Sequence, residues 1–349
     1  MTYKMSSNCR KRMLTLNFML FCLASFSQYN FSEVDKKIAE AQKNLSKNLV
    51  VLIYKDGKIV YKKESGEFKM TSQEPIASCS KWLTAALVMT FVDQGKISLD
   101  DKVSTYLPIF AKYGKGYITL RHCLSHMTGI QQEPVKLMTL FERRKYATLE
   151  DEVNDFASKK EIDFNPGSGF FYGGVGLDLA ARVIEVVAKR QFEQLMQERI
   201  MRPLNMRSTS FFSDRAVNPS GGAISAAIDY LNFLTMILNK GTFNGKTILS
   251  EKAIAEMQKP QTSLEMIKYA PKAAEGFNYG LGEWIQEVDA NGNSTVVCCP
   301  GLFGTWPMVD KCRGYACIFF MKGSLGEEKK DIYLDIKRSI DAVIPSNCK

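Results

Sequence analysis

The chain has 349 residues, of which 45% are hydrophobic and 11% aromatic, and its formal net charge is +9. This composition is sufficient for a buried core and excludes a disordered or fibrous protein. Runs of lysine and arginine never exceed three residues and are not interleaved with aromatic residues, so the charge does not predict a nucleic-acid-binding surface.

The first 27 residues differ from the rest of the chain. Four basic residues precede an apolar run of about 14 residues, Met13 to Phe26, and small residues follow. This order is typical of a secretory signal peptide, and the run is shorter than the roughly 20 residues that cross a bilayer. We therefore expect cleavage after Ser27 and an exported protein, periplasmic or secreted, without a stable membrane span. Its remaining part, 28–349, has a net charge of +5.

Two strand-rich regions lie near opposite ends of the chain. Val50 to Tyr54 and Ile59 to Lys62 are joined by a segment that contains Asp56-Gly57, a dipeptide typical of β-hairpin turns. Towards the C-terminus, β-rich runs separated by turn residues predict an antiparallel meander over 278–288, 294–299, 305–309 and 315–321.

Helical patterns precede, separate and follow these strands. They cover 33–46, 79–94, 119–125, 149–158, 177–201, 223–239 and 327–343. We therefore predict an α/β (α+β) fold with one antiparallel sheet, built from N- and C-terminal strands and flanked by helices. A mostly helical region, at about 90–240, is inserted in it. No linker is rich enough in proline or glycine to separate independent domains, so 28–349 is predicted to form one domain.

Cysteine and histidine are placed without a recognisable metal or disulfide pattern. Seven cysteines follow residue 27, an odd number with no CxxC pair, so no disulfide framework is indicated; a bond that involves Cys312 or Cys348 stays open. His122 and His126 are spaced i, i+4, but there is no HExxH motif and no third histidine. We interpret both as packing residues and predict no metal site.

Ser78-Cys79-Ser80-Lys81 opens a long apolar helix. A lysine three residues after a serine lies on the same helix face, so its amine reaches the hydroxyl. A serine nucleophile needs such a base, and a helix N-terminus adds a positive field and N–H donors for an oxyanion. Residues 346–349 have the same SxxK spacing in a segment that we interpret as a frayed tail, and a plain N-cap is the other interpretation of Ser78. The helix behind Ser78 favours the nucleophile.

Several segments resemble, in order, the sequence blocks of serine β-lactamase-related proteins, which include penicillin-binding proteins, class C β-lactamases and related esterases. They are 78–108, 118–130, 165–174, 220–225, 279–282 and 299–305. The resemblance covers residues from about 33 to 343 and implies a β-lactamase/transpeptidase-like fold. It further implies that Ser78 is the nucleophile, that Lys81 and Tyr172 share the proton relay, and that no cofactor or metal is needed.

The third block implies the oxyanion site, and two residues depart from the family pattern. Gly301 would let the backbone approach the substrate, and the N–H of Leu302 would stabilise the oxyanion together with that of Ser78. Gly174 stands where the family has an asparagine, and Cys299 where it has lysine or histidine. Loss of these groups favours an uncharged ester or amide, or an unusual peptide, over efficient hydrolysis of β-lactams.

We therefore predict a serine hydrolase that forms an acyl-enzyme on Ser78, with esterase, peptidase or weak β-lactamase activity on a small-molecule or peptide-like acyl substrate. The alternative is a non-catalytic penicillin-binding-protein-like homologue that binds or senses a cell-wall peptide. An α/β-hydrolase lacks support because there is no GxSxG motif. The main base, the natural substrate, the oligomeric state and whether 137–155 covers the site stay open.

Overall fold

The computed structural model describes residues 29–134, 145–323 and 329–348. The predicted signal peptide with its cleavage position, and part of segment 137–155, lie outside these residues. Within the described ranges, no helix is both long enough and apolar enough to cross a membrane.

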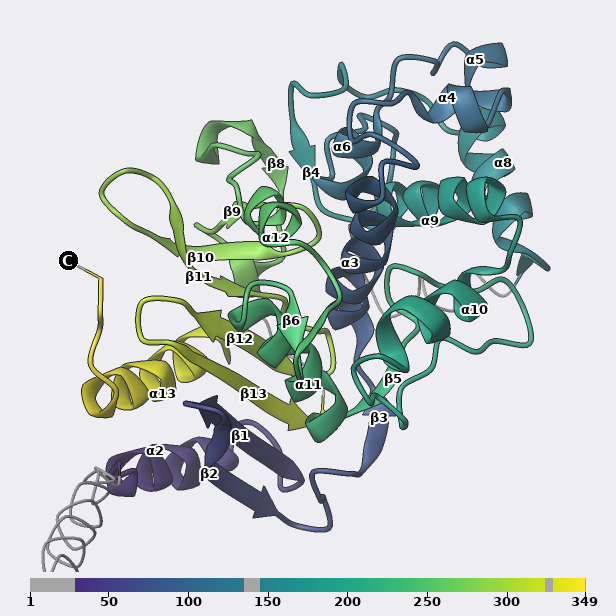
Figure 1. The fold of residues 1–349 in the computed structure, drawn as a ribbon. Coiled ribbons are helices and arrows are strands. Elements are labelled where there is room, and N and C mark those ends of the chain that lie inside the picture. The colour runs from purple at the N-terminus through teal and green to yellow at the C-terminus, as the bar shows by residue number, and fades with distance from the viewer. Residues whose placement is uncertain (1–28, 135–144, 324–328, 349) are drawn as a thin grey trace, which may run out of the picture. The chain divides into compact units, whose positions relative to one another are not determined.

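Strands from both ends of the chain form one seven-stranded sheet of order β2-β1-β13-β12-β11-β10-β9 (Figure 1). All its strand pairs are antiparallel, which confirms the predicted sheet. Its strands are Leu49–Lys55 (β1), Lys58–Ser65 (β2), Asn278–Tyr279 (β9), Trp284–Val288 (β10), Ser294–Cys298 (β11), Trp306–Asp310 (β12) and Tyr315–Met321 (β13). The short strands are Gln73–Pro75 (β3), Phe170–Phe171 (β4), Ile224–Ala226 (β5), Thr242–Phe243 (β6), Lys246–Thr247 (β7) and Ile267–Tyr269 (β8).

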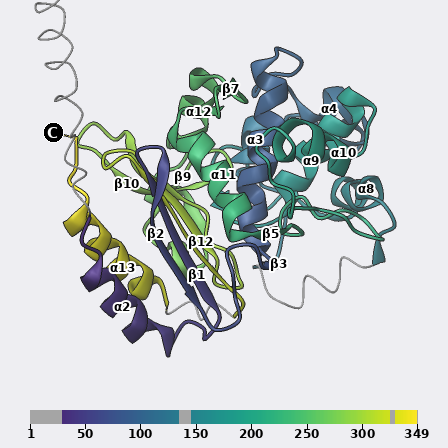
Figure 2. The same cartoon turned by 60° about the horizontal axis from the view of Figure 1, so that its bottom comes forward.

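Local sequence explains the hairpin and the central strand. Asp56 and Gly57 both have positive φ, +51° and +81°, which suits the tight turn between β1 and β2. All residues of β13 are buried. Helix α11 (Ala227–Leu238) packs on one face of the sheet, and α2 (Ser32–Gln42) and α13 (Lys330–Val343) lie side by side on the other (Figure 2). Because both faces are covered, the central strand is a continuous apolar run rather than an alternating one.

The helices from α3 (Ser80–Asp93) to α10 (Phe192–Met196) form the inserted region (Figure 1). Within it, every residue of α3 from Ser80 to Phe91 is buried, as expected for a helix that is apolar on all sides. The helices are Ser32–Gln42 (α2), Ser80–Asp93 (α3), Val103–Tyr106 (α4), Ile109–Lys112 (α5), Leu120–Leu124 (α6), Leu149–Lys159 (α8), Val175–Ala188 (α9), Phe192–Met196 (α10), Ala227–Leu238 (α11), Glu251–Met257 (α12) and Lys330–Val343 (α13). Short 3₁₀ turns are Ala77–Cys79 (η1), Leu264–Met266 (η4) and Lys272–Ala274 (η5), and Gln197–Met201 (η3) is a π-helical turn.

Three predicted elements have different boundaries. The single helix predicted over 177–201 is wrong, because Lys189 adopts a left-handed conformation (φ +53°) and ends α9 before α10 begins. The helix predicted from residue 223 begins at Ala227, because Ile224–Ala226 pairs with β3. The strand predicted over 278–288 is two strands, β9 and β10, interrupted after Tyr279. At Ile224–Ala226, pairing with the distant strand β3 thus replaced the local helical preference.

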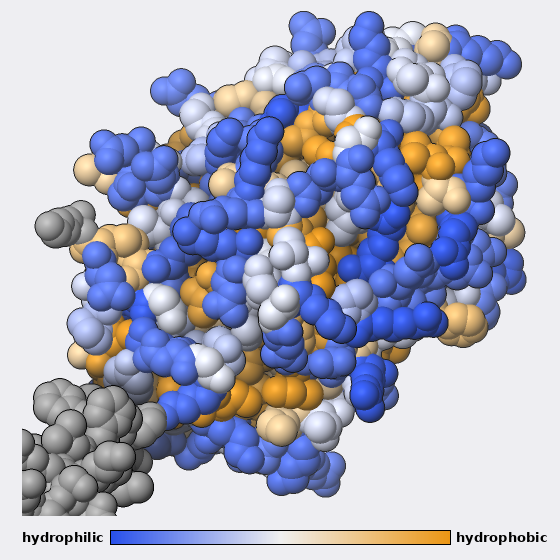
Figure 3. Space-filling model, viewed as in Figure 1, coloured by the Kyte–Doolittle hydropathy of each residue, from blue (hydrophilic) through white to orange (hydrophobic). Residues whose placement is uncertain are grey.

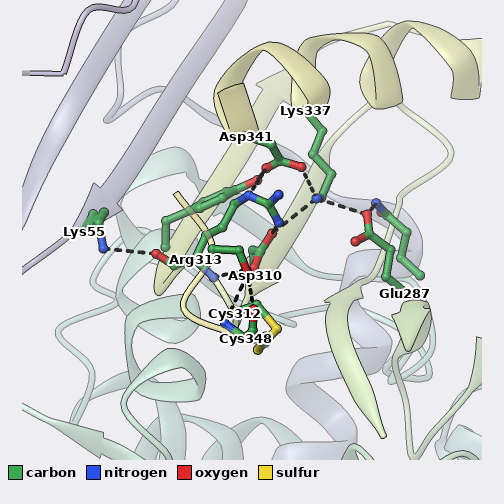
Figure 4. A network of polar contacts seen from close by, with 11 residues as sticks. Lys55, Glu287, Asp310, Cys312, Arg313, Lys337, Asp341 and Cys348 are labelled. Atoms are coloured by element: carbon green, nitrogen blue, oxygen red, sulfur yellow. Dashed lines mark hydrogen bonds and ion pairs between the residues drawn. A yellow bond between two sulfur atoms is a disulfide. The ribbon is translucent and has the colours of Figure 1, made fainter. Parts of the chain in front are cut away.

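The C-terminal helix is attached to the sheet by a buried polar network and a disulfide (Figure 4). Lys337 Nζ contacts carboxylate oxygens of Asp341, Glu287 and Asp310 at 2.6, 3.0 and 3.2 Å. Arg313 also pairs with Asp310 and Asp341. Next to this network, Cys312 forms a disulfide with Cys348, which answers the question that the sequence left open.

The visible face in Figure 3 is mostly hydrophilic, with apolar residues in patches between polar ones. The exposed large hydrophobic residues are scattered along the chain: Tyr113, Tyr117, Phe212, Ile224, Leu264 and Val288. Single apolar side chains at a surface are normal. The chemically distinctive region is instead the cavity beside the N-terminus of α3.

Candidate active site

Ser78 lies in η1, the turn that leads into α3. The preceding residue, Ala77, has φ +45°, a conformation that is uncommon for residues other than glycine and that clusters at functional sites. The backbone N–H of Ile76 donates to the carbonyl of Ala223 at 2.9 Å, which holds this turn against the segment before α11. Ser78 is thereby placed at the N-terminus of the most buried helix of the inserted region.

Lys81 lies one helical turn after Ser78 and faces it, as the SxxK spacing predicts. Its Nζ is 3.3 Å from Ser78 Oγ and donates a 2.7 Å hydrogen bond to the carbonyl oxygen of Ser220. Ser78 and Lys81 are only 7% and 2% exposed. Lys81 Nζ also lies 4.8 Å from the ring centroid of Tyr172. The structure therefore brings together the three residues that the sequence predicted as catalytic.

Tyr172 is enclosed by aromatic side chains. Its ring centroid lies 4.7, 5.1 and 6.1 Å from those of His126, Trp284 and Tyr279, and His126 Nε2 is 3.0 Å from Tyr279 Oη. Burial raises the pKa of Tyr172 well above its ordinary value, and a hydrogen bond with Ser78 opposes this only in part. The phenol is consequently protonated near neutral pH and has an O–H that can take part in proton transfer.

A cavity of about 220 Å³ opens at Ser78. Lys81, Gly174 and Leu302, all predicted site residues, also line it. The sequence left open whether segment 137–155 covers the site. Three of its described residues, Lys145, Tyr146 and Glu152, form part of the cavity wall. The described part of that segment therefore borders the cavity at Ser78.

The third-strand residues pack behind Ser78. Cys299 is fully buried, and its Sγ donates to the carbonyl oxygens of Ser78 and Gly282 at 3.3 and 3.7 Å. Burial raises the pKa of the Cys299 thiol to about 12, so this group is neutral. A Cβ on Gly301 would lie 2.4 Å from the carbonyl oxygen of Ile76. The glycine is therefore explained by close packing against the segment before Ser78, rather than by an approach of substrate.

The space beside Gly174 is occupied by polar groups of other segments. A Cβ at this position would lie 2.8 Å from Ser220 Oγ and 3.3 Å from Asp178 Oδ2. The block at 220–225 resembles a family segment, but Ser220 was not predicted to be a partner of Lys81. No pattern of residue types could have revealed it, because Lys81 contacts its backbone carbonyl.

Both histidines have local structural contacts. His122 and Thr119 form a capping box at the start of α6, in which the Thr119 N–H donates to His122 Nδ1 at 3.2 Å. His126 is buried in the aromatic enclosure of Tyr172, and burial together with the charge of Lys81 lowers its pKa well below the ordinary value. Within the described ranges, no group of three His, Cys, Asp or Glu side chains could hold a metal ion.

Curated proteins with similar sequences match only part of this chain. Penicillin-binding protein 4* of Bacillus subtilis (strain 168) is 28% identical over 178 residues, covering 48% of this chain and 39% of that protein. Lovastatin esterase of Penicillium rubens is 30% identical over 185 residues, covering 45% of this chain and 46% of that enzyme. This chain thus spans less than half the length of either relative.

Two further comparisons cover most of the chain. A β-lactamase-like protein from Bacteroides dorei DSM 17855, known as a crystal structure, has a TM-score of 0.79 and 28% identity, with 90% of this chain and 99% of that chain covered. The family model described as Beta-lactamase matches residues 34–338, which include the whole sheet and the cavity at Ser78. The chain therefore belongs to the Beta-lactamase family.

Proposed function

We propose that this protein is a serine hydrolase that forms an acyl-enzyme on Ser78. The family's members include hydrolases such as the esterase above. The observation that carries the proposal is the 3.3 Å contact between Ser78 Oγ and Lys81 Nζ at the mouth of a cavity, next to a buried and protonated Tyr172. A nucleophile, a basic side chain and a second proton carrier are thus within reach of one carbonyl carbon.

In the first half-reaction, Ser78 Oγ attacks the carbonyl carbon of the substrate and gives its proton to the Lys81–Tyr172 pair. The carbonyl oxygen becomes an oxyanion, which the backbone N–H groups of Ser78 and Leu302 stabilise. The tetrahedral intermediate then expels the leaving group, which takes up the proton from the same pair. Ser78 remains as an ester of the acyl group.

In the second half-reaction, water attacks the ester carbonyl. The Lys81–Tyr172 pair accepts a proton from this water and returns it to Ser78 Oγ, which is released together with the carboxylic acid. The base is assigned by comparing Lys81→Met with Tyr172→Phe. The variant that loses the rising limb of the pH–rate profile identifies the group that must be deprotonated.

The substrate is proposed to be an uncharged ester or amide. At the third-strand position where the family has lysine or histidine, this chain has the neutral thiol of Cys299, which is turned towards backbone carbonyls. A carboxylate next to the reacting bond, as in β-lactam antibiotics, therefore lacks the third-strand cation that would hold it in the family. Turnover of β-lactams should be weak compared with that of simple esters.

We also propose that the protein acts outside the cytoplasm, exported by the N-terminal segment. The Cys312–Cys348 disulfide supports this location, because structural disulfides persist mainly in oxidising compartments. The remaining five described cysteines are buried thiols, as expected for core residues rather than for a redox centre.

Intact-mass analysis of the mature protein tests the proposal. A fluorophosphonate and a short-chain nitrophenyl ester should each add one acyl or phosphonyl group to the wild type, with turnover of the ester, and neither should modify Ser78→Ala. Loss of such a nucleophile typically lowers the rate by on the order of 10⁴-fold. Ser346→Ala is the matched control, because Ser346 begins the other SxxK sequence and is exposed.

A β-lactam in the same experiment separates the substrate classes, and we expect slow or weak labelling. Modification that persists in Ser78→Ala would contradict the assignment of the nucleophile. Absence of both labelling and turnover in the wild type would instead support the alternative function, a non-catalytic homologue that binds or senses a cell-wall peptide.

A further inference from the structure

Two lysines that the proposed hydrolysis does not use line the cavity at Ser78. Lys145 precedes α8, and Lys160 directly follows this helix. Neither lies on the elements that carry Ser78, Lys81 or Tyr172. The cavity therefore has amines in two places, beside Ser78 and at the two ends of α8.

Lys160 is a partly buried cation without a carboxylate partner. Its Nζ donates to the carbonyl oxygen of Gln131 at 3.1 Å and lies 5.5 Å from the ring centroid of Phe156. Within the described ranges, no carboxylate oxygen lies within 4 Å of this nitrogen. An ammonium group has three N–H donors, so two are left to bind a ligand in the cavity.

The charges around Lys160 do not compensate for its burial. Burial lowers the pKa of Lys160, and the carboxylates of Glu133, Glu152 and Asp163 oppose this only in part, while the ammonium of Lys145 lowers it further. An anion bound beside Lys160 would reverse this balance, because an opposite charge within about 4 to 6 Å favours the charged form of an amine.

The carboxylates of the cavity wall do not offer an equal site for a cation. Glu152 and Asp178 line the cavity too, but each already has an interaction partner. Glu133 is exposed and is the carboxylate of the described wall without an amine within 4 Å. Lys145 and Lys160, by contrast, both face the cavity without a carboxylate at that distance. The wall at α8 therefore favours an anion over a cation.

Apolar side chains line the same cavity. They belong to Ala77, Phe156, Val175 and Leu302. The ring of Phe156 lies against the Lys160 ammonium, so an apolar surface adjoins the charged group. A chain of methylene groups that ends in an anion matches both features, because the methylenes are removed from water and the anion meets the amine.

We propose that Lys160, assisted by Lys145, binds a carboxylate at the far end of the acyl part of the substrate, so that this enzyme prefers esters and amides of dicarboxylic acids with one free carboxyl group. The inference rests on the proposed hydrolysis at Ser78 and narrows its substrate class. The reacting ester or amide group stays uncharged, and the missing third-strand cation concerns only a carboxylate next to the reacting bond. We assign the carboxylate to the acyl part because that part stays bound through both half-reactions.

Mononitrophenyl esters of adipic, suberic and sebacic acid test this proposal, because they vary the chain length at constant charge. Each is paired with the ester in which a neutral carboxamide of the same shape replaces the free carboxylate. The ratio of the two kcat/KM values is measured for the wild type and each variant, so that intrinsic reactivities cancel. Lys160→Met removes the charge, and Lys160→Arg keeps it. Lys159→Met is the matched control, because this neighbouring lysine is 71% exposed and pairs with Asp155.

We expect the wild type to prefer the carboxylate at one chain length at least, and the preference to weaken with added salt, because Lys160 is only partly buried. In Lys160→Met the ratio should fall about tenfold, equivalent to 1.4 kcal/mol. Lys160→Arg and Lys159→Met should keep it, and Lys145→Met should lower it less, because Lys145 is exposed. Activity on the carboxamide esters should persist throughout, which also reports that the variants fold.

The inference is overturned by a wild type without preference for the carboxylate at any chain length, or by an unchanged ratio in Lys160→Met. An equal loss on both esters would assign Lys160 a structural role through Gln131, and a preference for esters that end in an ammonium group would assign the site to Glu133. Should Lys160→Met fail to fold, Lys160→Gln, which keeps an N–H donor for the Gln131 carbonyl, decides the matter. If the wild type hydrolyses none of the esters through Ser78, the proposed function itself fails, and that outcome is distinct from an active enzyme without the preference.

Discussion

Lys81 and Lys337 are the two least exposed lysines among the described residues, at 2% and 3%, yet their surroundings differ. Lys337 contacts the carboxylates of Asp341, Glu287 and Asp310 (Figure 4). Burial alone lowers the pKa of Lys337, but these carboxylates together raise it above the ordinary value. Lys81 contacts the Ser78 hydroxyl, the Ser220 backbone carbonyl and the ring of Tyr172.

The comparison shows how one residue type serves two purposes. Three carboxylates keep Lys337 positively charged, which suits a lysine that attaches α13 to the sheet. A lysine that shares in the proposed proton transfer from Ser78 must be able to lose its own proton, and the hydroxyl and the carbonyl that Lys81 contacts are neutral groups. Replacing Lys337, which carboxylates surround, is therefore expected to lower the stability of the protein. Replacing Lys81, beside the proposed nucleophile Ser78, is expected to lower the reaction rate.

The largest effect is expected for Lys81→Met. Removing one member of the proposed Lys81–Tyr172 proton-transfer pair should lower kcat/KM by on the order of 10⁴-fold. The free energy of unfolding should change by only about 1 kcal/mol, because the variant loses the hydrogen bond to the Ser220 carbonyl but keeps an unbranched side chain of similar length. Ester hydrolysis and urea unfolding measure the two quantities. A strongly destabilised variant that remains active would contradict the assigned roles.

Lys337→Met should show the opposite pattern. It leaves Asp310, which is fully buried, with Arg313 as its remaining charged partner, and we expect a loss of about 3 kcal/mol in the free energy of unfolding. The rate per folded molecule should be unchanged. Arg338→Met on the same helix is the control, because its ion pair with Asp335 is exposed and should contribute less than about 1 kcal/mol.

Breaking the disulfide tests whether the C-terminal region is purely structural. Cys312 and Cys348 are 36 residues apart, and closing a loop of that length stabilises a protein by about 3 to 4 kcal/mol. Cys348→Ser should lose up to this amount while its activity at low temperature is kept. Reducing agent should lower the melting temperature of the wild type but leave that of Cys348→Ser unchanged. A shift in the variant as well would show that other cysteines are involved.

Glu283 extends the comparison to a buried acid. Burial raises the pKa of this fully buried carboxyl to about 8, from 4.5 as the ordinary value. Between these pH values the folded protein keeps a proton that the unfolded chain has lost, so stability falls as pH rises, by about 1.4 kcal/mol per pH unit. Urea unfolding at pH 5, 6 and 7 should show this fall in the wild type but not in Glu283→Gln. Glu265→Gln, at an exposed position, should behave as the wild type.

The smallest effect is expected for Cys299→Ser. A hydroxyl can donate to the carbonyl of Ser78 as the thiol does, so kcat/KM should change less than about tenfold, or 1.4 kcal/mol. Steady-state hydrolysis of the nitrophenyl ester measures this change in kcat/KM. A much larger loss would assign the thiol a part in the reaction.

Much of the fold could be predicted because its signals are local. The Asp56-Gly57 turn, the β-rich runs separated by turn residues near the C-terminus and the apolar helix behind Ser78 each depend on neighbouring residues. Local signals were insufficient at Lys189, where a residue other than glycine ends α9 in a left-handed conformation. They were also insufficient at Ile224–Ala226, which pairs with a strand about 150 residues earlier.

By itself, the sequence determined that strands from both ends share one sheet and that Ser78 and Lys81 lie on one face of a helix, because turn chemistry and helical periodicity are set by residues close in the chain. Only the tertiary structure decided that Lys81 donates to the Ser220 carbonyl, that Cys299 faces backbone rather than the cavity, and that Gln132 fills the space beside Gly173. These contacts join segments distant in sequence, and they arise from backbone positions and free volume, which residue types alone do not encode.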